Sequence, residues 1–188
     1  MIPLVYHKKR EAVKCDIRGR KETTMEIRKT KREEFERVMK IYRAARVFMA
    51  ENGNPDQWGE DYPPSEMIRA DIEEGKSYVC TEGEEILGVF YYAEGIDPTY
   101  VRIEDGAWLD DAPYGVIHRI AVAVQGRGVA KVCFDFGFSR CGNLKIDTHE
   151  CNLPMQKALA KNGFVRCGTV YLENGEPRIA YQKIKENG

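Results

Sequence analysis

Hydrophobic positions along residues 25–185 follow two alternating periods, one typical of β-strands and one typical of α-helices. Short apolar runs predict strands at 26–29, 77–81, 86–93, 115–123, 144–148, 165–172 and 178–184. Apolar side chains at helical spacing predict helices from residue 35, at 65–74, after Gly128 and at 154–162. This order of elements predicts an α/β (α+β) fold, in which a mixed sheet is flanked by helices.

The length of 188 residues fits a single domain, and no long linker or internal repeat divides the chain. We expect this domain to span residues 25–188. Residues 1–24 are rich in lysine and arginine and show no sustained period, so they predict a basic, flexible extension or an upstream start before Met25. A nucleic-acid-binding arm is the less favoured interpretation of this segment.

Charge, hydrophobicity and cysteine content argue against a nucleic-acid-binding, membrane-spanning or metal-binding protein. The formal net charge of −1 argues against nucleic acid as a partner. The sequence has no apolar run long enough for a membrane helix, so we expect no membrane association and a cytoplasmic location. The six cysteines are scattered without a CxxC pair, which predicts free thiols and no metal site.

The most informative segment joins the apolar strand at 115–123 to the helix after Gly128. Two residues in this loop, Gly126 and Gly128, carry no side chain, so a phosphate can approach the backbone. Free N–H groups at the start of the helix favour an anion, which predicts a pyrophosphate site. The sequence lacks the third glycine of the dinucleotide fingerprint and the Gly-Lys-Ser/Thr of the phosphate loop. A glycine turn with a purely steric role stays open.

The loop resembles the Q/R-x-x-G-x-G/A signature of the GNAT N-acetyltransferase superfamily, with Gln125, Gly128 and Ala130 at its positions. The strand at 144–148, the helix at 154–162 and Gly163-Phe164 are similar in order to the second half of that family. The resemblance implies an acyltransferase (EC 2.3.1.-) that uses acetyl-CoA and no metal. It also implies a mostly antiparallel sheet with a V-shaped gap between the strands at 115–123 and 144–148.

By this resemblance, acetyl-CoA occupies the gap and the adjoining loop. The pantetheine arm is expected to contact the backbone of Ile120, Ala121 and Val122. The pyrophosphate is expected to lie against Gln125, Gly126, Arg127, Gly128, Val129 and Ala130. The interval from Val122 to Gln125 is shorter than is usual in the family, which predicts a tighter turn from strand to loop. Arg127 either adds a charge contact or stays solvated.

Acetyl transfer to an amine requires removal of a proton from the ammonium group and departure of a thiolate. His118 is the first candidate for the base, because it lies two positions before Ile120 beside the expected thioester. Family members that acetylate arylalkylamines are similar in having a histidine just before a Leu-Ala-Val. A histidine with a purely structural role in the sheet is the alternative. His149 is the second candidate and Glu150 the third, and either is equally explained as a loop residue.

The sequence departs from the family at the expected donor to the thiolate. Family members commonly have a tyrosine shortly before the Gly-Phe, whereas this chain has Leu159, which cannot donate a proton. Either Tyr171, Tyr114 or an ordered water takes that role, or the thiolate leaves unassisted and is protonated by solvent or by the ammonium group. Asn152 matches an asparagine that bonds the cofactor in the family, and it is equally explained as a helix N-cap.

Together these features predict an acetyl-CoA-dependent N-acetyltransferase that acetylates a primary amine by direct attack in a ternary complex. No cysteine occupies an evident nucleophile position, which argues against an acetyl-enzyme. The alternative is a noncatalytic acyl-CoA-binding or regulatory module of the same fold, favoured by Leu159 and the short loop. A nucleotide-binding protein of another class is a second rival.

The acceptor is expected to be a small-molecule amine or a peptide amine. Acidic loop residues near aromatic ones favour a cationic small amine, whereas solvated carboxylates are the plainer explanation. The residues concerned are Glu94, Asp97, Glu104, Asp105, Asp110, Asp111, Trp58, Tyr62, Trp108 and Tyr114. The sequence leaves open an amino sugar as acceptor and a homodimer as the oligomeric state.

Overall fold

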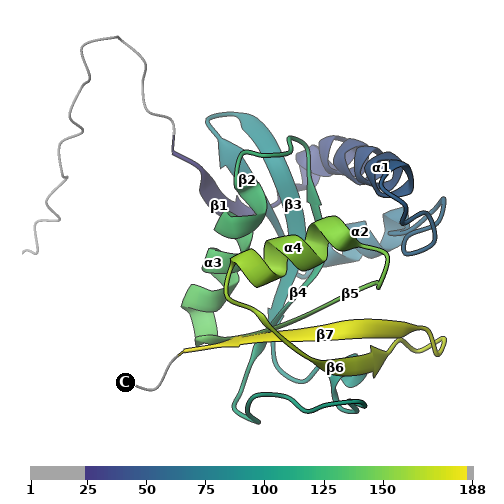
Figure 1. Ribbon diagram of the computed structural model, residues 1–188. Helices are drawn as coiled ribbons and strands as arrows, with labels where there is room; N and C mark the ends of the chain where they lie inside the picture. The colour runs from purple at the N-terminus through teal and green to yellow at the C-terminus, as the bar shows by residue number, and fades with distance from the viewer. Residues whose placement is uncertain (1–23, 186–188) are drawn as a thin grey trace, which may run out of the picture.

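The computed structural model describes residues 24–185, which form one seven-stranded sheet with helices on both faces (Figure 1). The strand order is β1-β2-β3-β4-β5-β7-β6, and β4 and β5 form the parallel pair within an otherwise antiparallel sheet. The predicted mixed, mostly antiparallel sheet flanked by helices is therefore confirmed. Of the expected extension at 1–24, all but residue 24 lies outside the described residues.

The elements follow the hydrophobic pattern closely, with ends shifted by one or two residues. The strands are β1 (Glu26–Lys29), β2 (Ser77–Glu82), β3 (Glu85–Glu94), β4 (Gly115–Val122), β5 (Asn143–Thr148), β6 (Val165–Tyr171) and β7 (Pro177–Ile184). The helices are α1 (Phe35–Glu51), α2 (Ser65–Glu73), α3 (Val129–Cys141) and α4 (Leu153–Lys161). Short 3-10 turns at Arg32–Glu34 and Pro98–Tyr100 were not predicted.

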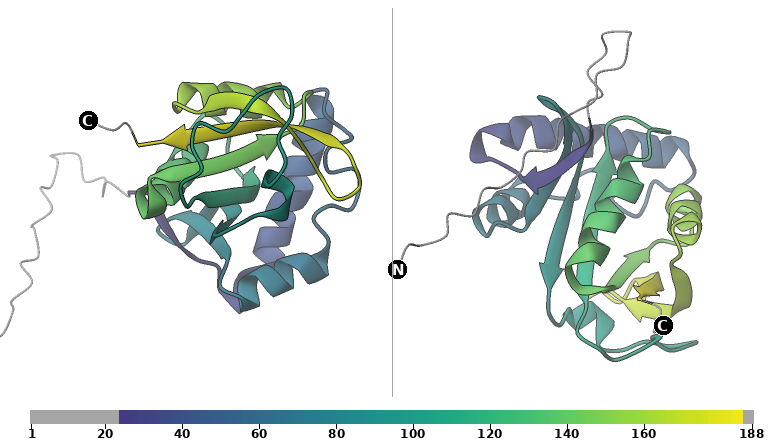
Figure 2. Two further views of the ribbon diagram at one scale, coloured as in Figure 1. Left: turned by 90° about the horizontal axis from the view of Figure 1, so that it is seen from below. Right: turned by 90° about the vertical axis from the view of Figure 1, so that its left-hand side faces the viewer.

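Each face of the sheet buries its own set of apolar side chains, because side chains alternate between the faces along every strand. On one face α3 and α4 contribute Phe134 and Leu159 to the core. On the other face α1 and α2 contribute Val38 and Ile68. The loop between β3 and β4 covers the rest of this second face with Tyr100. Figure 2 shows the helices on the two sides of the sheet.

β4 and β5 separate soon after they start. Their parallel register joins Gly115 to Leu144 and Val116 to Lys145, and within the described chain it goes no further. From Ile117 onward the edge of β4 faces a gap instead of a neighbouring strand. The expected V-shaped opening between these strands is confirmed.

A bulge in β4 lies beside this gap. β3 pairs Tyr91 with His118 and Val89 with Ala121, so Arg119 and Ile120 together face one residue of β3. Arg119 adopts a φ angle of 52°, in the left-handed region that residues with a side chain rarely occupy. The bulge therefore changes the direction of β4 between His118 and the residues expected to hold the pantetheine.

Among residues 24–185, no helix has both the length and the apolar character that crossing a bilayer requires.

Candidate active site

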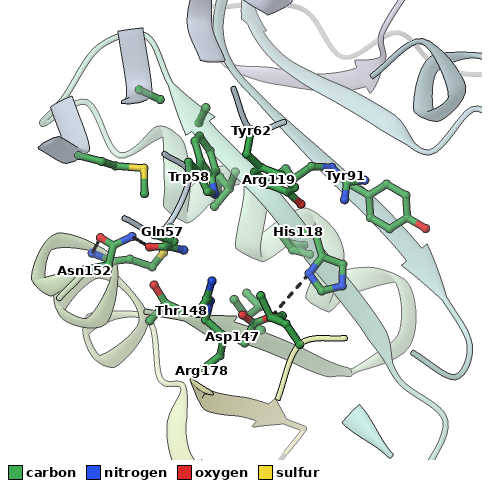
Figure 3. Close-up of a pocket in the computed structure, with 18 of the residues that line it drawn as sticks. Gln57, Trp58, Tyr62, Tyr91, His118, Arg119, Asp147, Thr148, Asn152 and Arg178 are labelled. Carbon is green, nitrogen blue, oxygen red and sulfur yellow. Dashed lines mark hydrogen bonds and ion pairs between the residues drawn. The ribbon is translucent and has the colours of Figure 1, made fainter. Parts of the chain in front are cut away.

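A cavity of about 1090 Å³ opens where β4 and β5 separate (Figure 3). The loop between α1 and α2 forms one wall, and the start of α4 forms another. The turn between β6 and β7 closes a third side. The gap predicted for the cofactor is thus continuous with a space between loops that can hold a second substrate.

His118 projects from β4 into this cavity between two carboxylates. Its Nε2 atom lies 2.7 Å from Oδ2 of Asp97, and its Nδ1 atom lies 3.7 Å from Oδ1 of Asp147. Asp97 is held in place because it accepts a hydrogen bond from the Thr99 amide (2.9 Å), while its own amide donates to the Tyr114 hydroxyl (3.1 Å). Figure 3 shows the imidazole pointing toward Asp147 across the cavity.

The contacts of the two carboxylates indicate which nitrogen of His118 donates a hydrogen bond and which can accept a proton. Burial opposes ionisation of Asp97, but the hydrogen bond and charge of His118 outweigh it and hold the pKa of Asp97 below its usual range. Tyr100 donates from its hydroxyl to Oδ1 of Asp147 (2.7 Å), and burial raises the pKa of Tyr100 well above its usual range. In the neutral tautomer that donates from Nε2 to an ionised Asp97, the lone pair of the imidazole lies on Nδ1. His118 is therefore placed to accept a proton at Nδ1, on the side of Asp147.

A buried ion pair anchors the bulge next to His118. Nη2 of Arg119 lies 2.9 and 2.8 Å from the two carboxylate oxygens of Asp71 on α2, and each side chain is 11% exposed. The guanidinium also lies over the ring of Tyr91, 4.5 Å from its centroid. This contact fixes the left-handed backbone of Arg119 to a helix on the second face of the sheet.

The glycine loop leads from β4 into the start of α3. Gly126 and Gly128 both have a φ angle of 78°, which explains why these positions carry glycine. The Val132 amide donates to the Gly128 carbonyl (3.2 Å), so the amides of residues 129–131 precede the first bond of the helix. The free amides thus lie where the sequence predicts a pyrophosphate site, and anion binding by this loop stays a prediction.

The expected cofactor residues divide into two groups. Six of them line the cavity: Ile120, Ala121, Val122, Gln125, Ala130 and Asn152. Gly126, Arg127, Gly128 and Val129 do not line it, and Val129 is buried in the core. Arg127 is paired with Glu82 on β2, with Nη2 2.9 Å from each carboxylate oxygen. A phosphate contact from Arg127 would use the N–H groups of Nη1 or Nε, because Nη2 is bonded to Glu82.

Asn152 connects the start of α4 to the loop between α1 and α2. Its Oδ1 atom accepts a hydrogen bond from the Met155 amide (3.2 Å), which makes Asn152 the N-cap of α4. Its Nδ2 atom donates to Oε1 of Gln57 (2.9 Å), which also accepts from Nδ2 of Asn54 (2.8 Å). Gln57 thereby holds two walls of the cavity together.

The other two candidate catalytic residues, His149 and Tyr171, lie outside the set of residues that line the cavity. His149 accepts a hydrogen bond at Nδ1 from the Cys151 amide (3.1 Å). Tyr171 donates from its hydroxyl to Glu104 (2.9 Å). Leu159, at the position of the family's tyrosine, is fully buried in the core.

The cysteines that the structure describes are free thiols, and none lines the cavity. Cys80, Cys133 and Cys167 are buried, as the sequence suggested for several of them. Cys15 lies outside the described residues. Within residues 24–185, no group of three or more His, Cys, Asp or Glu side chains is arranged to hold a metal ion.

Among the charged side chains that line the cavity, carboxylates outnumber arginines. The acidic members are Asp56, Asp71, Glu74, Asp97, Asp147, Glu173 and Glu176. The two lining arginines, Arg119 and Arg178, are each already bonded to a carboxylate, since Nη2 of Arg178 lies 2.8 Å from Glu176. Of the loop residues named from the sequence, Asp97, Trp58 and Tyr62 line the cavity and the others do not.

Sequence reasoning did not find Asp147, Arg119 or Gln57 as residues of the site. Asp147 is the single carboxylate of β5, and no spacing motif marks it. Arg119 reaches the site because of the bulge in β4, and the bulge depends on pairing with β3. Only the fold brings these residues to one cavity.

Comparison with solved structures identifies the family. A GNAT-family acetyltransferase from Streptococcus agalactiae is 35% identical to this chain, with 87% of this chain and 96% of that chain covered and a TM-score of 0.78. This chain belongs to the GNAT family of acetyltransferases. No family model matches the sequence, and no curated protein matches it either.

Two more distant structures share the GNAT fold. YncA from Salmonella typhimurium, solved with its cofactor acetyl-CoA, is 15% identical over 87% of this chain and 96% of its own, with a TM-score of 0.58. The NatC complex bound to Gag peptide and CoA contains a chain that is 14% identical, with 86% of this chain and 99% of that chain covered and a TM-score of 0.57.

Proposed function

We propose that this GNAT protein is an N-acetyltransferase that binds acetyl-CoA and transfers the acetyl group directly to a primary amine in a ternary complex. The observation that carries the proposal is the position of His118, between Asp97 and Asp147 in a cavity that continues into the gap between β4 and β5. The open edge of β4 and the free amides of the glycine loop support binding of an extended thioester with a pyrophosphate.

Acetyl-CoA would lie along β4, with its pantetheine beside Ile120, Ala121 and Val122 and its pyrophosphate at residues 125–130. Unpaired amides at the start of α3 would stabilise the phosphate charge. Asn152 would contact the cofactor through the second hydrogen of Nδ2 or the second lone pair of Oδ1, because Gln57 and the cap of α4 use one of each.

His118 would act as the general base. The attacking amine would enter between Nδ1 of His118 and Asp147, where the carboxylate attracts the ammonium group and the imidazole removes its proton. Asp97, bonded to Nε2, would stabilise the imidazolium that forms. Direct transfer is favoured over an acetyl-enzyme, since no described cysteine lines the cavity.

A small cationic amine, such as an aliphatic diamine, suits the lining of the cavity best. The carboxylates outnumber the arginines, and both arginines are already bonded, so a second positive charge on the acceptor would find acidic partners. Trp58 and Tyr62 offer aromatic faces for such a cation. A peptide amine is the second acceptor class, because the NatC structure holds a peptide on the same fold.

The test measures thiol release from acetyl-CoA with a panel of diamines, monoamines, amino acids and peptides. We expect the highest kcat/KM for a diamine, and a His118→Ala loss of about 10²- to 10⁴-fold in kcat. If His149→Ala shows this loss in kcat and His118→Ala does not, the base is His149. Binding of acetyl-CoA without turnover of any amine would instead support the noncatalytic acyl-CoA-binding module.

A further inference from the structure

The departing thiolate still lacks a hydrogen-bond donor in the proposed transfer, on which this inference rests. Leu159 stands where the family resemblance leads one to expect a tyrosine, and it is buried among the apolar residues between the sheet and α3. Its side chain has no polar hydrogen. A side-chain donor to the sulfur would therefore come from another element on the same side of the sheet.

Thr148, the last residue of β5, has a buried hydroxyl that can supply this hydrogen-bond donor. The residue is 1% exposed and lines the cavity, in the gap beside Asp147 and Asn152 (Figure 3). Among the residues that the structure describes, no hydrogen-bond partner lies within reach of its Oγ1 atom. Buried hydroxyl groups are nearly always hydrogen-bonded, so an unpaired one on a cavity wall points to a ligand as its partner.

The alternation of side chains along β5 places Thr148 on the cofactor side of the sheet. Thr148 shares a face with Ile146, which packs in the same core as Leu159. Asp147 projects to the opposite face, where it meets His118. The base and the Thr148 hydroxyl thus lie on opposite faces of the sheet beside the gap, so the imidazole can reach the amine while the hydroxyl reaches the sulfur.

We propose that the hydroxyl of Thr148 donates a hydrogen bond to the sulfur of CoA as the thiolate departs, in place of the tyrosine that Leu159 replaces. The amine nitrogen forms a bond to the acetyl carbon, the carbon–sulfur bond breaks, and its electron pair goes to sulfur. The amine proton passes to Nδ1 of His118 and then to solvent. Thr148 keeps its own proton and stabilises the charge on sulfur through the hydrogen bond.

The test compares Thr148→Val, which keeps the shape and removes the hydroxyl, with Thr148→Ser, which keeps the hydroxyl. We expect Thr148→Val to lower kcat about ten- to hundredfold with little change in KM for acetyl-CoA, because a hydrogen bond to a charged partner is lost. Thr148→Ser is expected to retain most of the activity.

A second measurement needs no acceptor. The thiol of CoA bound to the full chain is titrated by the ultraviolet absorbance of the thiolate, and its pKa is expected to rise by about one unit or more in Thr148→Val, a tenfold loss in thiolate stabilisation. Equal thiol titrations and equal kcat values in Thr148→Val and wild type would overturn the proposal for Thr148 while leaving acetyl transfer intact. Failure of CoA to bind the wild-type protein would overturn both.

Discussion

The buried pair of Asp71 and Arg119 gives the sharpest test of how the bulge is held beside the site. Asp71→Asn removes the negative charge at nearly constant volume, and it leaves a guanidinium that is 11% exposed without its counter-ion. Arginine cannot lose its proton to relieve this. Breaking a buried ion pair from one side costs about 3–5 kcal/mol of unfolding free energy.

This loss is large relative to the stability of a domain of this size. At roughly 2–4 °C per kcal/mol for 150–250 residues, it corresponds to a fall in Tm of about 6–20 °C. The assay is urea unfolding followed by circular dichroism, with the slope m checked for constancy so that the change in midpoint reports stability.

The exposed pair of Lys131 and Asp135 on α3 provides the matched control, with side chains 61% and 48% exposed. Asp135→Asn is expected to change stability by less than about 0.5 kcal/mol, as is usual for a surface pair. If Asp71→Asn lowers the unfolding free energy no more than Asp135→Asn does, the guanidinium of Arg119 is solvated in the variant. The ion pair with Asp71 then does not anchor the bulge.

Three further substitutions test separate features of the fold. Gly128→Ala is expected to lower stability by about 1 kcal/mol in urea unfolding, because a Cβ there meets nothing within 4 Å and only the backbone at φ 78° is strained. Gly88→Ala is expected to lower stability further, by about 1–3 kcal/mol in the same assay, because its Cβ would lie 2.7 Å from Cγ1 of Val129. A loss of stability no larger than that of Gly128→Ala would contradict the packing argument. The hydrogen bond from Arg28 (2.7 Å) lowers the pKa of Glu34 in the folded protein, although burial opposes this. The bond therefore stabilises the folded state fully above about pH 4.5, and this contribution is lost as the pH falls through the lowered pKa of Glu34. Glu34→Gln should therefore lose about 1–2 kcal/mol at pH 7 and converge with wild type in acid, and a pH-independent difference would exclude this linkage.

The sequence by itself determined the elements and the position of the glycine loop, because these depend on local chemistry. Hydrophobic alternation along a strand and apolar spacing along a helix are set by backbone geometry, so the strands and helices were predicted, and the ends that were given lie within one or two residues of the true ones. Gly126 and Gly128 marked the loop because only glycine adopts a φ angle of 78° without strain.

The tertiary structure alone decided how the site is completed, because the partners come from distant parts of the chain. His118 was a candidate from its strand, but its place between Asp97 and Asp147 depends on the loop after β3 and on β5. The bulge at Arg119 needs β3 opposite it and Asp71 on α2 beneath it. Hydrophobic periodicity constrains neighbours a few residues apart, whereas ion pairs and unpaired buried hydroxyls arise only where folding brings remote groups into a space without water.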